Sequence, residues 1–172
     1  MIYMVDHIYT DPATEPAWHD WYAGYLHRLL SVPGIHSAQR FKAIGQRPSR
    51  YLAMYSVESA DVYQSPAYQG IGGGGSQSVR FHRAYALWTR NLFEGAERAP
   101  EIGKGQHVLV IDSLTPHQEL RRGVSPLWLK AAGLQMTTPY RAVIVLDAET
   151  AGSVVAGSGG YVYEPITPFM RS

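Results

Sequence analysis

The order of strand-like and helix-like segments in the first half of the chain restricts its fold most. Residues 2–9 are β-branched and aromatic without a breaker, which indicates a strand. A helix is expected over residues 18–30, because at about 100° per residue its large apolar side chains share one side. These side chains are Trp18, Tyr22, Tyr25, Leu26 and Leu29. The Pro33-Gly34 pair ends this helix.

Two further strands are expected over residues 35–44 and 51–58, followed by a helix over 60–69 and a strand around 85–89. The resulting order, β-α-β-β-α-β, is that of the ferredoxin-like split βαβ motif. Such a motif forms one antiparallel sheet with both helices on one face. A second sheet usually covers the other face, supplied by a partner chain or by an internal repeat.

The second half predicts a shortened version of the first. A glycine- and proline-containing linker over residues 94–106 precedes strands expected over 107–114, 140–147 and 160–166. Short helices are expected over 116–122, 126–134 and 149–156. We therefore predict an α+β fold, a ferredoxin-like dimeric α/β barrel with a degenerate second copy or C-terminal extension. In this scheme 1–98 form the first barrel unit, and 99–172 form a linker and a second half packed on it. A tandem chain could close its own barrel, whereas a single unit would need a homodimer, which is the expected assembly.

Composition excludes several classes of function. The chain has no cysteine, so disulfides, thiolate metal sites and cysteine nucleophiles are absent. Its 15 basic and 14 acidic residues form no basic block, and no nucleic-acid partner is expected. The N-terminus lacks a basic region followed by an apolar run, and no apolar stretch approaches about 18 residues. We expect a cytoplasmic protein with no membrane partner.

Aromatic and histidine residues are numerous, with 12 tyrosines, 4 tryptophans and 7 histidines. Buried tyrosine and tryptophan need partners for their polar atoms. This composition fits a pocket for a small, partly aromatic or oxygenated molecule. It fits a protein interface equally well, because both residue types are enriched there.

Three stretches carry a resemblance to a known superfamily: Trp21-Tyr22 with Leu29–Gly34, Ser37–Phe41, and Tyr51–Tyr55 with Ser65–Tyr68. Over residues 1–98 the chain resembles uncharacterised proteins of the dimeric α/β-barrel superfamily, near the EthD-like and stress-responsive barrel groups. That superfamily includes isomerases, polyketide cyclases, quinone-forming monooxygenases and haem-degrading enzymes, and many members need no cofactor. The resemblance implies a pocket between sheet and helices or inside the barrel.

His7 is the candidate general base. It shares a strand face with Tyr3, Val5 and Tyr9, and if Met4 and Ile8 face the helices, His7 faces the barrel interior. The competing interpretation is a hydrogen-bonded structural histidine.

Tyrosines supply the other candidate catalytic groups. Tyr22 and Tyr25 on the first helix, and Tyr55 on the third strand, could donate hydrogen bonds to a developing oxyanion. Packing in the core explains the same residues without any catalytic role.

Four residues are candidates for substrate binding. Arg40 could hold a carboxylate, although a salt bridge to Asp6 or Glu58 is the alternative. Tyr68 and His82 are implied by the resemblance, since some polyketide cyclases of this fold place a tyrosine and a histidine near the second helix. Trp88 on the fourth strand completes the set.

No metal or cofactor is expected. The histidines show no His-x-x-x-His spacing, and the glycine-rich segment 70–75 lacks the Gly-Lys-Ser/Thr ending of a phosphate-binding loop. That segment is expected to be a connector or a flexible lid. The leading hypothesis is a cofactor-independent lyase, isomerase or cyclase acting by proton transfer on a small oxygenated metabolite. A non-catalytic binding or stress-response protein, and a haem- or oxygen-dependent oxidoreductase, are the alternatives.

Overall fold

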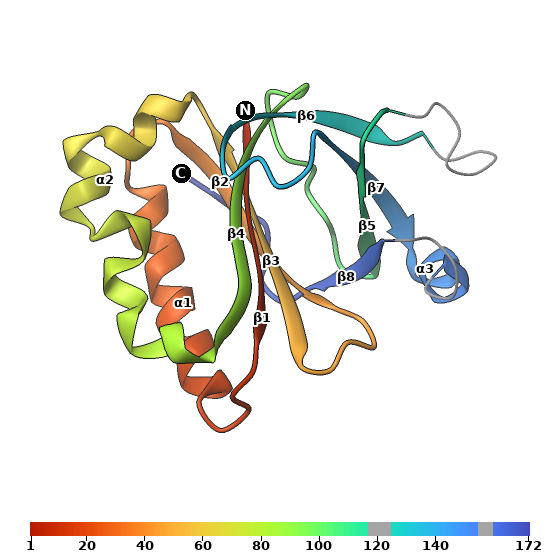
Figure 1. Ribbon diagram of the computed structural model, residues 1–172, viewed down its shortest axis with the longest axis horizontal. Coiled ribbons are helices and arrows are strands. Elements are labelled where there is room, and N and C mark those ends of the chain that lie inside the picture. The colour runs from red at the N-terminus through yellow and green to blue at the C-terminus, as the bar shows by residue number, and fades with distance from the viewer. Residues whose placement is uncertain (117–124, 155–159) are drawn as a thin grey trace.

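The chain folds into a closed antiparallel barrel with helices on its outside (Figure 1). The computed structural model describes residues 1–116, 125–154 and 160–172. Around the barrel the strands follow the order β3-β1-β4-β6-β7-β5-β8-β2, and β2 pairs with β3 to close it. The barrel strands are β1 (Ile2–Tyr9), β2 (Ile35–Ala43), β3 (Ser49–Val57), β4 (Tyr85–Glu94), β5 (Gln106–Ser113), β6 (Leu127–Leu134), β7 (Tyr140–Asp147) and β8 (Tyr161–Pro165). A short strand, β9 (Met170–Arg171), lies beside β2.

Two seams join the halves of the chain into one sheet. At the first seam β4 pairs with β6, where Asn91 lies opposite Leu134. At the second seam β2 pairs with β8, where Phe41 lies opposite Pro165. The second half therefore covers the open face of the first within the same chain. The homodimer and the division between residues 98 and 99 stay predictions.

The helices are unevenly distributed over the two halves. On the outer face of the first half lie α1 (Glu15–Leu30), α2 (Pro66–Gly70) and two 3₁₀ segments, η1 (Ala60–Gln64) and η2 (Gly73–Ala84) (Figure 1). On the second half α3 (Ala148–Val154) packs against β5 and β7. The predicted buried stripe of α1 is confirmed. The expected helix over 60–69 breaks into η1 and α2, because Ser65, which precedes Pro66, is extended.

Apolar side chains form three layers. The barrel interior is filled from both halves of the chain by residues that include Ile2, Met4, Phe41, Leu52, Phe93, Val110, Leu129 and Val143. An aromatic layer lies between the first half of the sheet and its helices. A third layer lies under α3. β1 and β3 therefore each have one face in the barrel and one face under the helices.

The segment predicted as a helix over 126–134 is a strand. In β6 the side chains of Leu129 and Ala131 are buried while Lys130 and Ala132 are exposed, which is the period of a strand. Alanine, leucine and lysine favour helices locally, but pairing with both β4 and β7 outweighs that preference. The helix expected over 116–122 lies almost wholly outside the described residues.

A charged cluster crosses the barrel interior. Arg141 on β7 donates to Asp6 on β1 at 2.6 Å and to Asp112 on β5 at 2.6 and 3.0 Å. Tyr163 donates to the second oxygen of Asp6 at 3.2 Å. Asp6 and Arg141 are each only 4% exposed. Burial lowers the pKa of Arg141, but the two carboxylates outweigh it and hold this pKa above its ordinary value.

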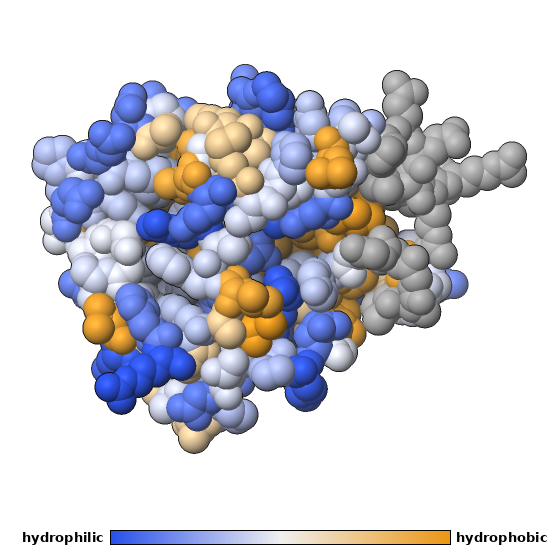
Figure 2. All heavy atoms as spheres, viewed as in Figure 1, coloured by the Kyte–Doolittle hydropathy of each residue, from blue (hydrophilic) through white to orange (hydrophobic). Residues whose placement is uncertain are grey.

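None of the described helices has the length and apolar character that crossing a membrane requires. Hydrophilic and hydrophobic residues are interspersed over the face shown in Figure 2.

Replacement of Arg141 with methionine should lower the free energy of unfolding by about 3–5 kcal/mol, because Asp6 is left buried without its partner. Urea unfolding of the native protein and the variant measures the difference. Lys130→Gln, which breaks an exposed ion pair to Glu94, is the control and should change little. If Arg141→Met matches that control, the cluster does not hold the barrel together.

Replacement of Gly24 with alanine should stabilise the protein by about 0.5–1 kcal/mol, since alanine favours the helix more than glycine does. A Cβ at Gly24 meets no atom within 4 Å. Gly34, with φ of +88° and Val62 at 2.6 Å from a built Cβ, is the opposite case, and Gly34→Ala should destabilise. Thermal melts measure both variants. The melting temperature should rise for Gly24→Ala and fall for Gly34→Ala, and shifts of the same sign would contradict this expectation.

Candidate functional site

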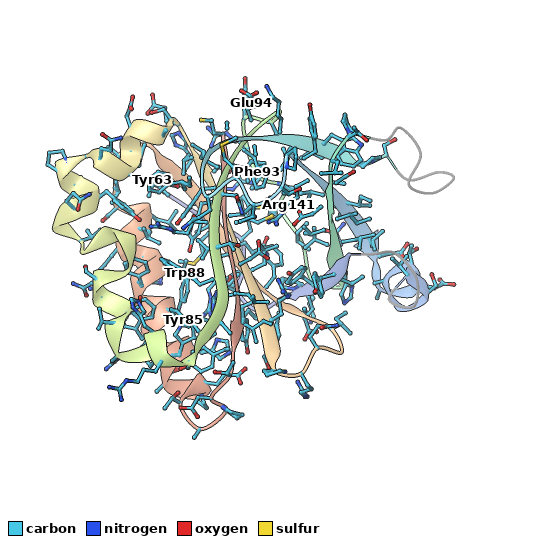
Figure 3. All side chains as sticks on the ribbon, in the orientation of Figure 1. Tyr63, Tyr85, Trp88, Phe93, Glu94 and Arg141 are labelled. Atoms are coloured by element: carbon cyan, nitrogen blue, oxygen red, sulfur yellow. The ribbon has the colours of Figure 1, made fainter. Side chains whose placement is uncertain are left out.

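A pocket lies between the helix-facing side of the sheet and the layer formed by α1, α2 and η2. Figure 3 shows Tyr63, Trp88 and Tyr85, three of its lining residues, between the sheet and this helical layer. The other lining residues are Tyr3, Val5, His7, Trp21, Tyr22, Tyr25, Leu29, Ile35, Tyr55, Tyr68, Gly72, Gly74, Gly75, Gln77, Ser78 and Arg90. Phe93, on the opposite face of β4, and Arg141 on β7 lie on the barrel side of the sheet.

The cavity inside this pocket is small, about 60 Å³. An apolar cavity that holds benzene measures about 150 Å³. Side chains or backbone at the wall must therefore move before an aromatic ring can enter. On the η2 side the wall consists partly of backbone, because Gly72, Gly74 and Gly75 line it at positive φ. That residues 70–75 act as a flexible lid stays a prediction. Glycine backbone in the pocket wall is compatible with it.

The prediction that His7 faces the barrel interior is wrong. His7 points toward the helices with Tyr3, Val5 and Tyr9, while Met4 points into the barrel. Its ring lies edge-on to Trp18, with 5.1 Å between centroids, and 4.8 Å from the ring of Tyr85. The neighbouring Asp6 enters the barrel to meet Arg141, and alternation along the strand sends His7 the other way.

His7 is not a hydrogen-bonded structural histidine either. It is 3% exposed, and within the described residues neither ring nitrogen has a hydrogen-bond partner. Burial lowers its pKa to about 3, and the positive charge of Arg40 adds to that effect. His7 is therefore neutral at ordinary pH. A neutral imidazole offers one donor and one acceptor to a ligand in the pocket.

The three tyrosines predicted as catalytic meet at this pocket. The hydroxyl groups of Tyr22 and Tyr55 are 2.8 Å apart and buried. Tyr25 lies beside Tyr22, with 6.1 Å between ring centroids. Burial raises the pKa of all three phenols, so they stay protonated. The Tyr22–Tyr55 pair has two hydroxyl hydrogens and uses one in the mutual bond, which leaves one for a ligand.

Arg40 is close to the pocket but does not line it. Its guanidinium lies 3.8 Å above the ring of Tyr22 and 4.4 Å from that of Trp18. The predicted alternative, a salt bridge to Asp6 or Glu58, is wrong: Asp6 faces the barrel and binds Arg141, and among the described residues Glu58 forms no ion pair with Arg40. Burial lowers the pKa of Arg40. Its placement makes it a fixed positive charge behind the tyrosines.

The other predicted binding residues divide into two groups. Tyr68 and Trp88 line the pocket. His82 lies behind it, where its Nε2 is 2.8 Å from the hydroxyl of Ser78 and its ring stacks on Trp88. Sequence reasoning missed other lining residues, among them Tyr3, Tyr63, Tyr85 and Arg90. The signal available was strand period, because Arg90 is two residues after Trp88 and shares its face.

No group of three or more histidine, aspartate or glutamate side chains in the described ranges could hold a metal ion. The haem alternative needs a histidine that faces a large cavity. His7 faces a cavity of about 60 Å³, so a haem, like any aromatic ligand, would require the wall to move, and by much more than a single ring does.

Acid should destabilise the protein through His7. Above pH 6.5 the histidine is neutral in both states, whereas between pH 6.5 and about 3 only the unfolded state binds the proton. As the pH is lowered through this window, the free energy of unfolding therefore decreases, by up to about 1.4 kcal/mol per pH unit. Burial, then Arg40, lowers the pKa of His19 to about 4, which adds to the same loss.

Urea unfolding at several pH values across that window checks this expectation. His7→Phe should give a shallower dependence on pH than the native protein. Replacement of the exposed His27 with glutamine is the matched control and should leave the dependence unchanged. Parallel curves for the native protein and His7→Phe would show that His7 is protonated equally in both states.

Comparisons with known proteins show the fold. No family model and no curated protein matches the chain. Among solved structures, an anthrone oxidase-like protein superposes with a TM-score of 0.62 at 13% identity, over 99% of this chain and 92% of that one. A provisionally named monooxygenase from Fusobacterium nucleatum gives 0.57 at 8% identity, over 99% and 96%. A similarly named protein from Lactobacillus acidophilus gives 0.50 at 7%, over 99% and 98%. The expected grouping near EthD-like proteins stays a prediction.

Proposed function

We propose that the pocket binds a small aromatic molecule carrying a ketone or hydroxyl group, and that His7 removes a proton from it to begin an oxidation by dioxygen. One observation carries the proposal: a buried neutral imidazole lines the pocket, and both of its nitrogens lack a partner in the described protein. A buried polar group without a partner is costly, and a ligand that bonds to it repays that cost.

The protein groups around the ligand suit a developing negative charge. His7 would form a bond to a proton whose C–H bond breaks, and the electron pair would pass to the carbonyl oxygen of the ligand as an enolate. The free hydroxyl hydrogen of the Tyr22–Tyr55 pair could donate to that oxygen. Arg40, fixed over Tyr22, adds positive charge nearby.

The low pKa of His7 limits which ligands can react. A histidine whose pKa is about 3 is a weak base, so it retains the proton only while the substrate anion lies beside it. The ligand must therefore have an acidic C–H. An example is a methylene group bonded to aromatic rings that conjugate it with a ketone, because the carbanion is then delocalised onto the carbonyl oxygen.

Oxidation is preferred to a lyase, isomerase or cyclase reaction because the fold neighbours carry oxidase and monooxygenase names. The carbanion would pass electrons to dioxygen, and His7 would return its proton. In balance, one CH₂ group and one O₂ give one C=O group and one water. Binding without turnover is the second candidate, and the weak basicity of His7 favours it.

The test uses tricyclic aryl ketones with an acidic methylene group, such as an anthrone, and records oxygen uptake together with quinone absorbance. The native protein should consume one O₂ per ketone formed, faster than buffer alone. His7→Phe should lower the rate by about 100- to 10,000-fold, the usual contribution of a general base. His27→Gln removes a solvent-exposed histidine of α1, so it is the control and should keep the full rate.

Anaerobic incubation in D₂O separates the alternatives. Exchange of the methylene hydrogens without product would support proton transfer to His7 followed by oxidation. Rearranged or cyclised product without oxygen would favour the isomerase, lyase or cyclase reaction. Saturable binding with neither exchange nor product would leave the binding protein as the better account. A His7→Phe variant that is folded and fully active would contradict the role of His7.

A further inference from the structure

Arg90 is a positive charge on the pocket wall without a counter-ion in the described residues. It lies on β4 opposite Val5, which also lines the pocket. Its guanidinium lies 4.7 Å from the ring centroid of Trp88, and its Nε is buried without a hydrogen-bond partner. Its backbone is held on both sides by Gln135, which accepts from the N–H and donates to the C=O, each at 3.0 Å. The backbone of Arg90 is therefore fixed, and its side chain contacts Trp88 but no carboxylate of the described residues.

A second residue of the same pocket wall, Tyr63, carries an unpartnered polar atom. The hydroxyl of Tyr63 is buried without a partner in the structure as described. Its ring packs against Tyr3 at 4.6 Å and Tyr68 at 5.1 Å between centroids. Arg90 and Tyr63 line the same pocket, and the charge of Arg90 opposes the rise in pKa that burial causes in Tyr3 and Tyr68, the two rings that pack against Tyr63.

Other arginines show what is unusual about Arg90. Arg141, Arg50 and Arg171 each lie within ion-pair distance of a carboxylate. Arg40 is buried under two aromatic rings and does not line the pocket. Within the described ranges, Arg90 is the arginine that lines the cavity. A guanidinium and a phenol with unused donors match an anionic oxygen group.

We propose that Arg90 and Tyr63 form an anion subsite, so that the ligand of this pocket is an aromatic carboxylate. This inference rests on the proposed ligand pocket and names its substrate class. His7 and the register partner of Arg90, Val5, are two residues apart on one face of β1, a separation of roughly 7 Å along the strand. In the bound ligand the carboxylate and the reacting carbon are therefore separated by about the width of one aromatic ring.

The test is a binding measurement that does not depend on turnover. Isothermal titration near neutral pH compares benzoate with benzamide, and 2-naphthoate with 2-naphthamide, which share shape but differ in charge. The native protein should bind the acids about 10- to 100-fold more tightly than the amides, as expected of charge-assisted hydrogen bonds. Arg90→Met should lose most of this preference, and Arg90→Lys should keep part of it.

Controls keep the result specific. Arg83→Met removes an exposed arginine of η2 and should leave the preference intact. Tyr63→Phe should weaken the acids more than the amides. Thermal melts confirm that each variant is folded.

Equal binding of acids and amides by the native protein, or an unchanged preference in Arg90→Met, would overturn the subsite. Failure of all four probes to bind would also overturn it. His7→Phe should retain the preference for acids even if it abolishes turnover. A failure of the subsite is thereby distinguished from a failure of the role proposed for His7.

Discussion

The ion pair between Asp6 and Arg141 sets the direction of the side chains on β1, and the site depends on that direction. Asp6 enters the barrel because its partner reaches across from β7. Alternation along the strand then places Tyr3, Val5 and His7 under the helices. A shift of this strand by one residue would move His7 into the barrel and Asp6 into the aromatic layer, and Arg141 would lose the carboxylate that meets it at 2.6 Å.

The ligand pocket lies on the helical side of the sheet, whereas the barrel interior is packed with side chains. Apolar residues from both halves fill the interior together with the buried ion pair of Asp6 and Arg141. On the helical side, polar atoms of His7, Tyr63 and Arg90 are buried without partners among the described residues. Their desolvation is uncompensated in the free protein. A ligand that satisfies these atoms gains that energy, which ties the chemistry of the pocket to the stability of the empty fold.

Local patterns were sufficient for much of the first half of the fold. The strand over residues 2–9 and the buried stripe of α1 are as predicted, because period and end signals lie within a few residues of each other. β6 was mistaken for a helix, since its composition favours one and the two strands that pair with it lie elsewhere in the chain. Local reasoning works where the deciding contacts are local.

The candidate site was predicted in its residue types more than in its geometry. His7, Tyr22, Tyr25 and Tyr55 do line one pocket. The face of His7 was wrong because it is decided by a contact of Asp6 with Arg141, 135 residues along the chain. Arg90 was missed although the period of β4 places it on the same face as Trp88. Tyr63 was missed because its place at the cavity follows from the packing of η1 against Tyr3 and Tyr68, which neighbouring sequence does not reveal.

Closure of the barrel has a consequence for how this protein can meet other copies of itself. An open sheet presents unpaired backbone groups that a strand of another molecule can join, which is a common route to aggregation and strand exchange. Here β2 and β3 pair with each other, which closes the ring of the described strands. Among these strands β6 pairs with β4 only at residues 91–94, so a stretch of β4 edge before residue 91 stays outside the described ladders. Joining of a strand from a second copy is thereby restricted to short stretches of this kind, because no full-length barrel strand lies at an open edge of the described sheet.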